Sequence, residues 1–399
     1  MGFGLPSAAE RSAPCNRAGS IRIRIVRVLL VAALVLASYE LATVAYRPLA
    51  QQPEPDAQEY ADSARNLAHG EGYSTTVRDM PTHPSGRHPP RYPPGFPIAL
   101  APFALFGDFP ANVQAGAKLI AVVYLLVMAM AALRLGGPLG ALIAVVLVWM
   151  SPFASTSASL VMSDALGALL AVALLPLVDR RTRGAWVAAG GLAGFAIAVR
   201  LSAVAVLASL LLTLKGRARG LAAAGAAPFL IGISLWQWMA FGAPWRTGYG
   251  YWLPGLETFS VGSLTRSGPR DGPWVIPDRF GHDTWLDLIC HPCPVGGAMA
   301  SLPSWIFYPL VLAGLFWVFA PPLVGVAGLT ASWMRRREAA AKLTLWTSAL
   351  TLAVQLPYFY QAARFMAAPA SMLTVMAAIG IARSVERLPF GTRCQARGS

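Results

Sequence analysis

The chain has 399 residues, of which 56% are hydrophobic and 13% are charged, and its formal net charge at pH 7 is +14. Soluble domains carry about 25% charged residues, and disordered chains are poor in apolar residues, so the composition excludes both classes. The class that remains is a polytopic membrane protein, whose helices need about 20 apolar residues each.

Apolar segments recur along the whole chain, between arginine clusters and turns rich in proline and glycine. We expect these segments to be helices, because a chain in lipid must satisfy its own backbone hydrogen bonds, and the alternation typical of a membrane β-barrel is absent. The sequence thus predicts an all-α polytopic membrane protein. Its ten expected transmembrane spans are residues 25–45, 113–133, 138–154, 164–178, 185–199, 201–214, 221–241, 305–333, 343–360 and 366–382.

The first span follows a basic leader that contains Arg22, Arg24 and Arg27. A signal peptide has such a leader, but the apolar stretch continues to Ala45 without a clear cleavage site. We interpret the span as an uncleaved anchor, with a cleaved signal peptide as the alternative.

Lysine and arginine are unevenly distributed among the segments that join the spans. A cytoplasmic N-terminus puts most of the 32 basic residues on the cytoplasmic side, as the positive-inside rule requires. Residues 1–24 and 383–399 are then basic cytoplasmic tails, residues 25–382 form the membrane domain, and two long segments, 46–112 and 242–304, face outward. Topology and contact with anionic membrane lipids explain the positive charge, so no nucleic-acid partner is needed.

The first outward segment contains a predicted amphipathic helix. Asp56, Tyr60 and Ala64 recur at helical spacing, and Gly70 or Gly72 is expected to end the helix. Asp56 stands in the first turn, where an acid complements the helix dipole whether or not it has another role.

A proline-rich motif, RYPPGFP, follows at residues 91–97. We expect it to form a stiff extended turn, because prolines at this density fit neither a helix nor a central strand. Arg91 and Tyr92 would lie at headgroup depth, where a guanidinium can bind a phosphate. The alternative is a snorkelling arginine beside an aromatic-belt tyrosine.

The pattern D-x3-Y-x3-A-x5-G-x-GY that begins at Asp56, followed by RYPPGFP, resembles the first outward loop of the GT-C glycosyltransferases. It is most similar to the family-39-like group, which contains protein O-mannosyltransferases, aminoarabinose transferases and Rgt-type lipopolysaccharide sugar transferases. Later elements fit the same pattern in the same order, namely Met162-Ser163-Asp164, Ala198-Val199-Arg200, Phe241-Gly242-Ala243-Pro244 with Gly248-Tyr249, and QAARFMAAP at 361–369 with Arg364.

The resemblance implies a sugar donor carried on a polyprenyl phosphate and an acceptor that is a lipid, a glycan or a protein. A hydroxyl acceptor needs a carboxylate to take its proton, and the leaving phosphate needs fixed positive charge. Asp56 is the candidate base, and Asp164 could hold the acceptor, polarise Asp56 or help to bind a divalent cation, the one cofactor that is suggested. The candidates for the donor phosphate are Arg91, Arg200 and Arg364, and those for the substrate cavity are Tyr60, Tyr92 and Tyr249.

The sequence gives the remaining polar residues no expected part in the active site. Glu59 and Asp62 are expected to be solvated acids, and His83 and His88 to be ordinary loop residues that are not metal or sugar ligands. The CHPC sequence formed by Cys290 and Cys293 is expected to be a local disulfide in an oxidising compartment, with a redox pair or half of a zinc site as alternatives.

The sequence therefore predicts a membrane glycosyltransferase that acts on the outer side of the membrane, and we expect that membrane to be the bacterial plasma membrane. A transporter or flippase of lipid-linked envelope precursors is the alternative, and a non-catalytic partner in an envelope complex is a third interpretation. The two halves of the chain show no repeat, whereas many transporters do. The candidate charges also cluster at span ends, which favours the enzyme.

Overall fold

The computed structural model describes residues 8–46, 48–49, 56–78, 84–252, 259–260, 264, 303–315, 318–358 and 362–387. Within these residues the chain is almost entirely helical, and its β-structure is limited to two isolated bridges, Thr75 to His88 and Phe259 to Tyr358. The expectations for His83, Cys290 and Cys293 concern residues outside this part of the chain.

Four of the described helices contain a stretch long and apolar enough to cross a membrane, namely Ile23–Thr43 within α1 (Ala8–Thr43), α4 (Ala111–Trp149), α9 (Gly216–Phe241), and the short 3-10 turn Ala363–Met366 with α16 (Ala367–Arg387). The shorter apolar helices include α6 (Asp164–Val178), α7 (Arg183–Val199), α8 (Val204–Thr213), α13 (Ser304–Ala313) and α14 (Val324–Met334). The all-α membrane class is therefore confirmed, whereas the number of ten spans stays a prediction.

Two predicted spans are separate helices that share the label α4 and meet at a break in the backbone, and one predicted span is divided. The segments 113–133 and 138–154 correspond to α4, which kinks at Gly137, where φ is +72°, just before Pro138. The prediction of one span over 305–333 was wrong, because α13 ends where Gly314 takes a φ of +74° and α14 begins only at Val324. Pro321 and Pro322 lie between the two helices, and a proline cannot donate the hydrogen bond that a continuing helix needs.

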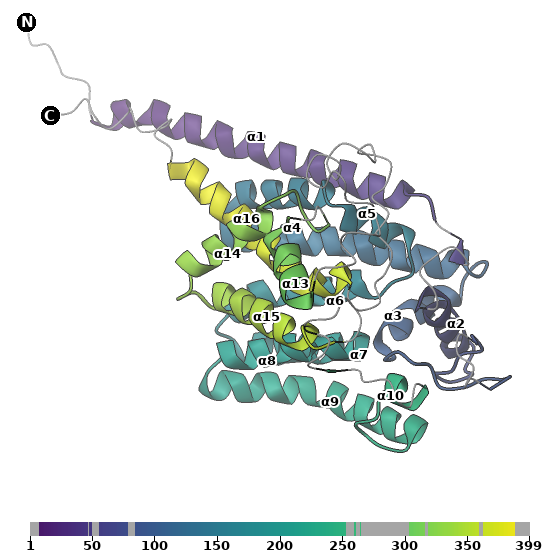
Figure 1. Cartoon of the computed structure of the whole chain (residues 1–399). Coiled ribbons are helices and arrows are strands. Elements are labelled where there is room, and N and C mark those ends of the chain that lie inside the picture. Colours follow the sequence, from purple (N-terminus) through teal and green to yellow (C-terminus); the bar gives the residue numbers. More distant parts are fainter. Residues whose placement is uncertain are drawn as a thin grey trace, which may run out of the picture.

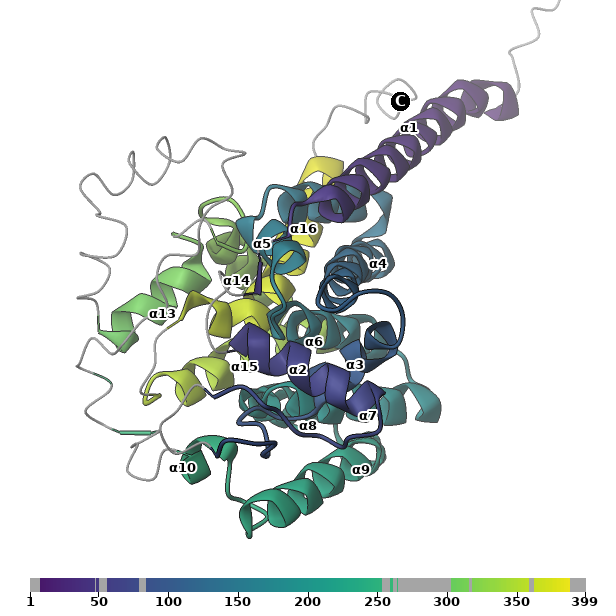
Figure 2. The same ribbon diagram turned by 90° about the vertical axis from the view of Figure 1, so that its right-hand side faces the viewer.

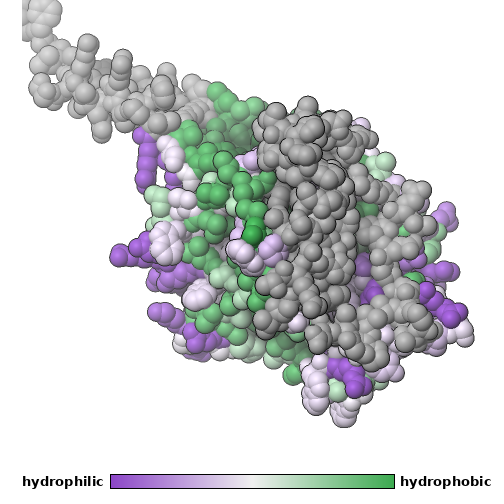
Figure 3. Space-filling view, in the orientation of Figure 1, coloured by the Kyte–Doolittle hydropathy of each residue, from purple (hydrophilic) through white to green (hydrophobic). Residues whose placement is uncertain are grey.

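The helices run alongside one another as a bundle, with α1 along one edge and α9 along another (Figure 1). Helix α16 is largely buried, while α1 and α9 are mostly exposed. On the face seen in Figure 3, hydrophobic residues form a band and hydrophilic residues lie on both sides of it. This is the distribution that a bilayer around the bundle would require.

Close helix packing at glycines joins α7 to α9. A Cβ atom added at Gly190 would lie 1.8 Å from the carbonyl oxygen of Ala222, and one added at Gly194 would lie 2.9 Å from the Cα atom of Ala226. Small residues spaced by four positions allow such backbone approach in membrane proteins. The contact fixes α7, whose end carries Ala198 and Arg200 into the site described below.

Three short helices, α2 (Asp56–Ala68), α3 (Gly95–Ala104) and α10 (Gly248–Trp252), gather at one end of the bundle (Figures 1 and 2). The amphipathic helix expected from Asp56 is confirmed, and both Gly70 and Gly72 beyond it take positive φ. The expectation that all of RYPPGFP is extended was wrong, because α3 begins at Gly95 and includes Pro97. A proline in the first turn of a helix loses no hydrogen bond, since the first N–H groups have no acceptor within the helix.

Candidate active site

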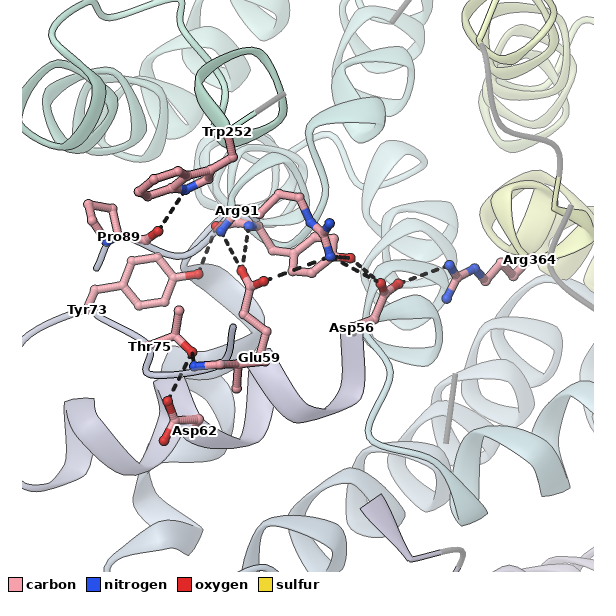
Figure 4. A network of polar contacts seen from close by, with 11 residues as sticks. Asp56, Glu59, Asp62, Tyr73, Thr75, Pro89, Arg91, Trp252 and Arg364 are labelled. Atoms are coloured by element: carbon pink, nitrogen blue, oxygen red, sulfur yellow. Dashed lines mark hydrogen bonds and ion pairs between the residues drawn. The ribbon is translucent and has the colours of Figure 1, made fainter. Parts of the chain in front are cut away.

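Asp56 is the point at which three distant parts of the chain meet (Figure 4). Arg364 donates a hydrogen bond from Nη2 to Asp56 Oδ2 over 3.0 Å, although 308 residues separate the two. The phenol of Tyr92 donates to Oδ1 of the same carboxylate, and Arg91 Nη2 lies 3.9 Å from that oxygen. The Asp56 side chain is 14% exposed, so the carboxylate is sheltered but reachable.

Arg91 and Tyr92 are held by close backbone contacts on both sides. A Cβ atom at Gly248 of α10 would lie 2.4 Å from the carbonyl oxygen of Arg91, and one at Gly95 of α3 would lie 2.5 Å from the backbone of Ala198 in α7. Tyr73 also donates to the carbonyl of Tyr92 over 2.8 Å. Only glycine fits at the two contact positions without displacing the neighbouring backbone, so the proline-rich turn has little freedom to move.

Glu59 departs from its expected solvated state. Its side chain is 1% exposed, and it accepts hydrogen bonds from the backbone N–H groups of Arg91 and Tyr92. The periodicity of α2 could not show this burial, because both donors lie more than 30 residues further along the chain. Asp62 is half-buried and accepts from the hydroxyls of Thr75 and Thr76 and from the N–H of Thr76.

A second ion pair, between Arg200 and Asp164, lies beside the first. Asp164 begins α6, its side chain is fully buried, and its Oδ2 atom has no hydrogen-bond partner among the described residues. The neighbouring Ser163 shares a 3.2 Å hydrogen bond with Tyr60 of α2, and Met162 Sδ lies 3.8 Å from Arg364 Nη1. The Met162-Ser163-Asp164 segment thus connects the two ion pairs.

Tyrosines line the space around Asp56 and keep their protons there. Burial and the nearby Asp56 charge raise the pKa of Tyr60 to about 12. Burial raises the pKa of Tyr92 and of Tyr249 well above the usual value as well. Since each phenol remains neutral at physiological pH, Tyr92 can act as a hydrogen-bond donor to Asp56.

Aromatic rings also face the guanidinium groups. The guanidinium carbon of Arg91 lies 4.7 Å from the ring centre of Tyr92 and 5.3 Å from that of Tyr249. Arg200 lies 5.1 Å from the ring of Phe365. Cations placed over aromatic faces are stabilised when water is scarce, which lowers the cost of keeping these arginines within the protein.

All eight residues singled out in the sequence meet at this end of the bundle, namely Asp56, Tyr60, Arg91, Tyr92, Asp164, Arg200, Tyr249 and Arg364. Sequence reasoning missed Glu59 and Phe365. His88 is buried against the ring of Trp252.

The charges of the cluster balance in this structure. Three arginines, Arg91, Arg200 and Arg364, face three carboxylates, those of Asp56, Glu59 and Asp164. A bound phosphate would bring additional negative charge and would compete with a carboxylate for a guanidinium. The arrangement therefore places guanidinium groups, which in general can bind a phosphate, next to the Asp56 carboxylate.

Comparisons with known proteins identify solved structures that have a similar fold. No family model and no curated protein sequence match the chain. The structure of ArnT from Cupriavidus metallidurans bound to undecaprenyl phosphate matches with a TM-score of 0.53 at 16% identity, over 90% of this chain and 60% of ArnT. The Archaeoglobus fulgidus oligosaccharyltransferase in complex with Zn and sulfate matches with a TM-score of 0.54 at 14% identity, over 91% of this chain and 50% of that protein.

A further structure, of the oligosaccharyltransferase AglB from Archaeoglobus fulgidus in complex with an inhibitory peptide and a dolichol-phosphate, matches with a TM-score of 0.51 at 13% identity. It covers 90% of this chain and 51% of AglB. ArnT and AglB are GT-C glycosyltransferases, and the chain has the GT-C fold that its motifs predicted. It spans about three fifths of the length of ArnT and half that of AglB.

Proposed function

We propose that the chain is a membrane glycosyltransferase that moves a sugar from a polyprenyl-phosphate donor to a hydroxyl acceptor on the outer side of the membrane. The observation that carries the proposal is the contact of Asp56 with Arg364 over 3.0 Å, with Arg91 3.9 Å away. It combines a candidate base with fixed positive charge at the end of an apolar bundle. The lipid phosphates bound by ArnT and AglB support the same donor class.

In the proposed reaction, Asp56 takes the proton of the acceptor hydroxyl as that oxygen forms a bond to the anomeric carbon of the sugar. The bond between the anomeric carbon and the donor's phosphate oxygen breaks, and the electron pair leaves with the polyprenyl phosphate. Arg364 and Arg91 stabilise the charge on that phosphate, with Arg200 as a third donor. Tyr92, which remains protonated, orients the Asp56 carboxylate.

Asp164 would hold the acceptor next to Asp56, since its Oδ2 atom has no partner among the described residues. This atom could also contribute one ligand to a divalent cation, and one neighbour was solved with Zn. The described residues include no group of three His, Cys, Asp or Glu side chains that could hold a metal, so we assign no step to one.

We further propose the topology that the arginine distribution predicts. Residues 25–382 would form the membrane domain, residues 1–24 and 383–399 would be cytoplasmic, and the segments 46–112 and 242–304 would face outward in a bacterial plasma membrane. Helices α2, α3 and α10 lie at one end of the bundle, while the C-terminal end of α16 and the N-terminal half of α1 lie at the other (Figure 1). This placement is consistent with two cytoplasmic tails.

The test compares envelope glycans and lipids, by mass spectrometry, in cells lacking the protein and in cells complemented with the wild type or a variant. We expect one sugar modification to disappear in the deletion and to return with the wild type and with Asp108→Asn, whose side chain is exposed. Asp56→Asn should not restore it. Full restoration by Asp56→Asn would overturn the assignment of the base. Movement of a lipid-linked sugar across the membrane without transfer to an acceptor would instead support the flippase alternative.

A further inference from the structure

Glu59 lies one helical turn after Asp56 on α2, so both carboxylates point toward the same stretch of chain (Figure 4). Its side chain is 1% exposed. A buried carboxylate is costly unless hydrogen bonds and a cation offset the loss of water. Glu59 has both kinds of partner, and both belong to the segment that carries Arg91 and Tyr92.

The backbone of that segment has few donors to offer. The sequence over 89–94 is PPRYPP, and proline has no backbone N–H. Arg91 and Tyr92 therefore carry the two N–H groups of these six residues, and both donate to Oε1 of Glu59, the one from Tyr92 over 3.3 Å. One carboxylate oxygen thus accepts every backbone hydrogen bond that the turn can donate.

The side chains of the same two residues lead back to Asp56. Arg91 Nη2 lies 3.9 Å from Glu59 Oε2 and 3.9 Å from Asp56 Oδ1. It also donates to the phenol oxygen of Tyr92 over 2.7 Å, and that phenol donates to Asp56. Glu59 is consequently connected to Asp56 through the backbone and side chains of Arg91 and Tyr92.

We infer that Glu59 is a positioning residue for the transfer reaction: it fixes the proline-rich turn so that Tyr92 and Arg91 reach Asp56. This inference rests on the proposed function, because it gives Glu59 a role in the same site. Glu59 does not contact the reacting atoms in this scheme. Its effect on transfer passes through Tyr92 and Arg91.

The test is a double-mutant cycle on the transfer rate in proteoliposomes. Glu59→Ala should lower the rate about tenfold to a hundredfold, since small displacements of a catalytic group have costs of this size. In a Tyr92→Phe background, which already lacks the phenol that reaches Asp56, the same substitution should lower it only about twofold. Glu59→Gln, which keeps an acceptor oxygen, should retain more activity than Glu59→Ala.

Asp62→Asn is the matched control. Asp62 is an acid on the same helix that also anchors a loop, but it accepts hydrogen bonds from Thr75 and Thr76 instead of from Arg91 and Tyr92. Its substitution should have the same effect in both backgrounds. Equal losses from Glu59→Ala with and without Tyr92→Phe, or wild-type activity of Glu59→Ala, would overturn the inference. If Glu59→Ala fails to fold in detergent, the Glu59→Gln cycle decides in the same way.

A second measurement does not depend on transfer. Phenylglyoxal modification of Arg91, followed by peptide mass spectrometry, reports how firmly the buried guanidinium is held. Glu59→Ala should accelerate the modification about fivefold or more, as release of a packed contact allows local opening, while Asp62→Asn should leave it unchanged. If wild-type protein transfers no sugar, the proposed function fails. If Arg91 reacts equally in wild type and Glu59→Ala, the positioning role fails whatever the function is.

Discussion

Two ionic clusters lie near opposite ends of the segment formed by the 3-10 turn Ala363–Met366 and α16, and they differ in almost every physical respect. Arg364 belongs to the site cluster of Asp56, Glu59, Arg91, Asp164, Arg200 and Arg364. Arg383, about 30 Å further along at 1.5 Å per residue, belongs to the remote cluster of Arg335, Glu338 and Arg383. The remote cluster is the more open of the two, because Glu338 and Arg383 are each 42% exposed, whereas the Arg335 side chain is 12% exposed. The site cluster joins distant residues, and the Arg91 side chain is 5% exposed.

The difference shows that exposed and buried ion pairs have different effects on the stability of a protein. Exposed ion pairs contribute little to stability, but they also need little support. Buried pairs lose the hydration of both groups, and apolar side chains of similar size would often serve stability as well. Three arginines and three acids gathered within the protein at one end of the bundle therefore indicate a functional role. The same number of exposed arginines at the other end would not indicate one.

The largest expected effect comes from removing one arginine from each cluster. Arg364→Ala should reduce transfer about a hundredfold or more, because it removes the guanidinium that contacts Asp56 and would stabilise the leaving phosphate. Arg383→Ala should change transfer less than about twofold, as expected for an exposed pair. The measurement is the initial rate in proteoliposomes at matched protein content. Similar losses in both variants would show that position in the site cluster has no special importance.

Stability should separate the clusters in the same order. Asp164→Asn leaves Arg200 without its buried carboxylate and should cost about 2 kcal/mol of unfolding free energy. Glu338→Gln, at an exposed site, should cost less than about 1 kcal/mol. Thermal unfolding midpoints in one detergent, with and without high salt, provide the comparison. Salt should weaken the contribution of Glu338 and leave that of Asp164 nearly unchanged.

Whether a feature of the two clusters could be predicted from the sequence depends on how far apart in the sequence the residues that form it are. The position of Asp56 at the start of α2 followed from local spacing, and so did the boundaries of α6. The burial of Glu59 depends on N–H groups at Arg91 and Tyr92, and no local pattern reports them. The division of 305–333 at Gly314 depends on backbone conformation that an apolar average conceals. The meeting of Asp56 with Arg364 was expected only from the family resemblance, since no spacing rule extends over such a separation.

A binding experiment tests whether the Asp56 carboxylate competes with a lipid phosphate for Arg364. In the structure Arg364 is occupied by Asp56, so an incoming phosphate must compete with that carboxylate. Asp56→Asn, which should abolish transfer, should therefore bind undecaprenyl phosphate about threefold to tenfold more tightly than wild type, a gain of up to about 1.4 kcal/mol. Microscale thermophoresis or calorimetry in detergent can measure this difference. Unchanged or weaker binding would mean that Asp56 does not compete for the arginine that holds the phosphate.

The smallest expected effect concerns a cation that contacts the C-terminal end of α1 but lies outside the site cluster. Lys118 of α4 donates from Nζ to the carbonyl oxygens of Ala42 and Val44, over 3.0 Å and 2.7 Å, and so caps the end of α1. Lys118→Met should cost about 0.5–1 kcal/mol of stability, the usual value of one capping charge, and should change transfer less than about twofold. Lys118→Arg should preserve both. Because this lysine has carbonyl partners instead of carboxylates, it separates two explanations of the arginine effects. A large loss of transfer in Lys118→Met would mean that any cation near this helix end matters, whereas a small loss would restrict the requirement to the cations that surround Asp56.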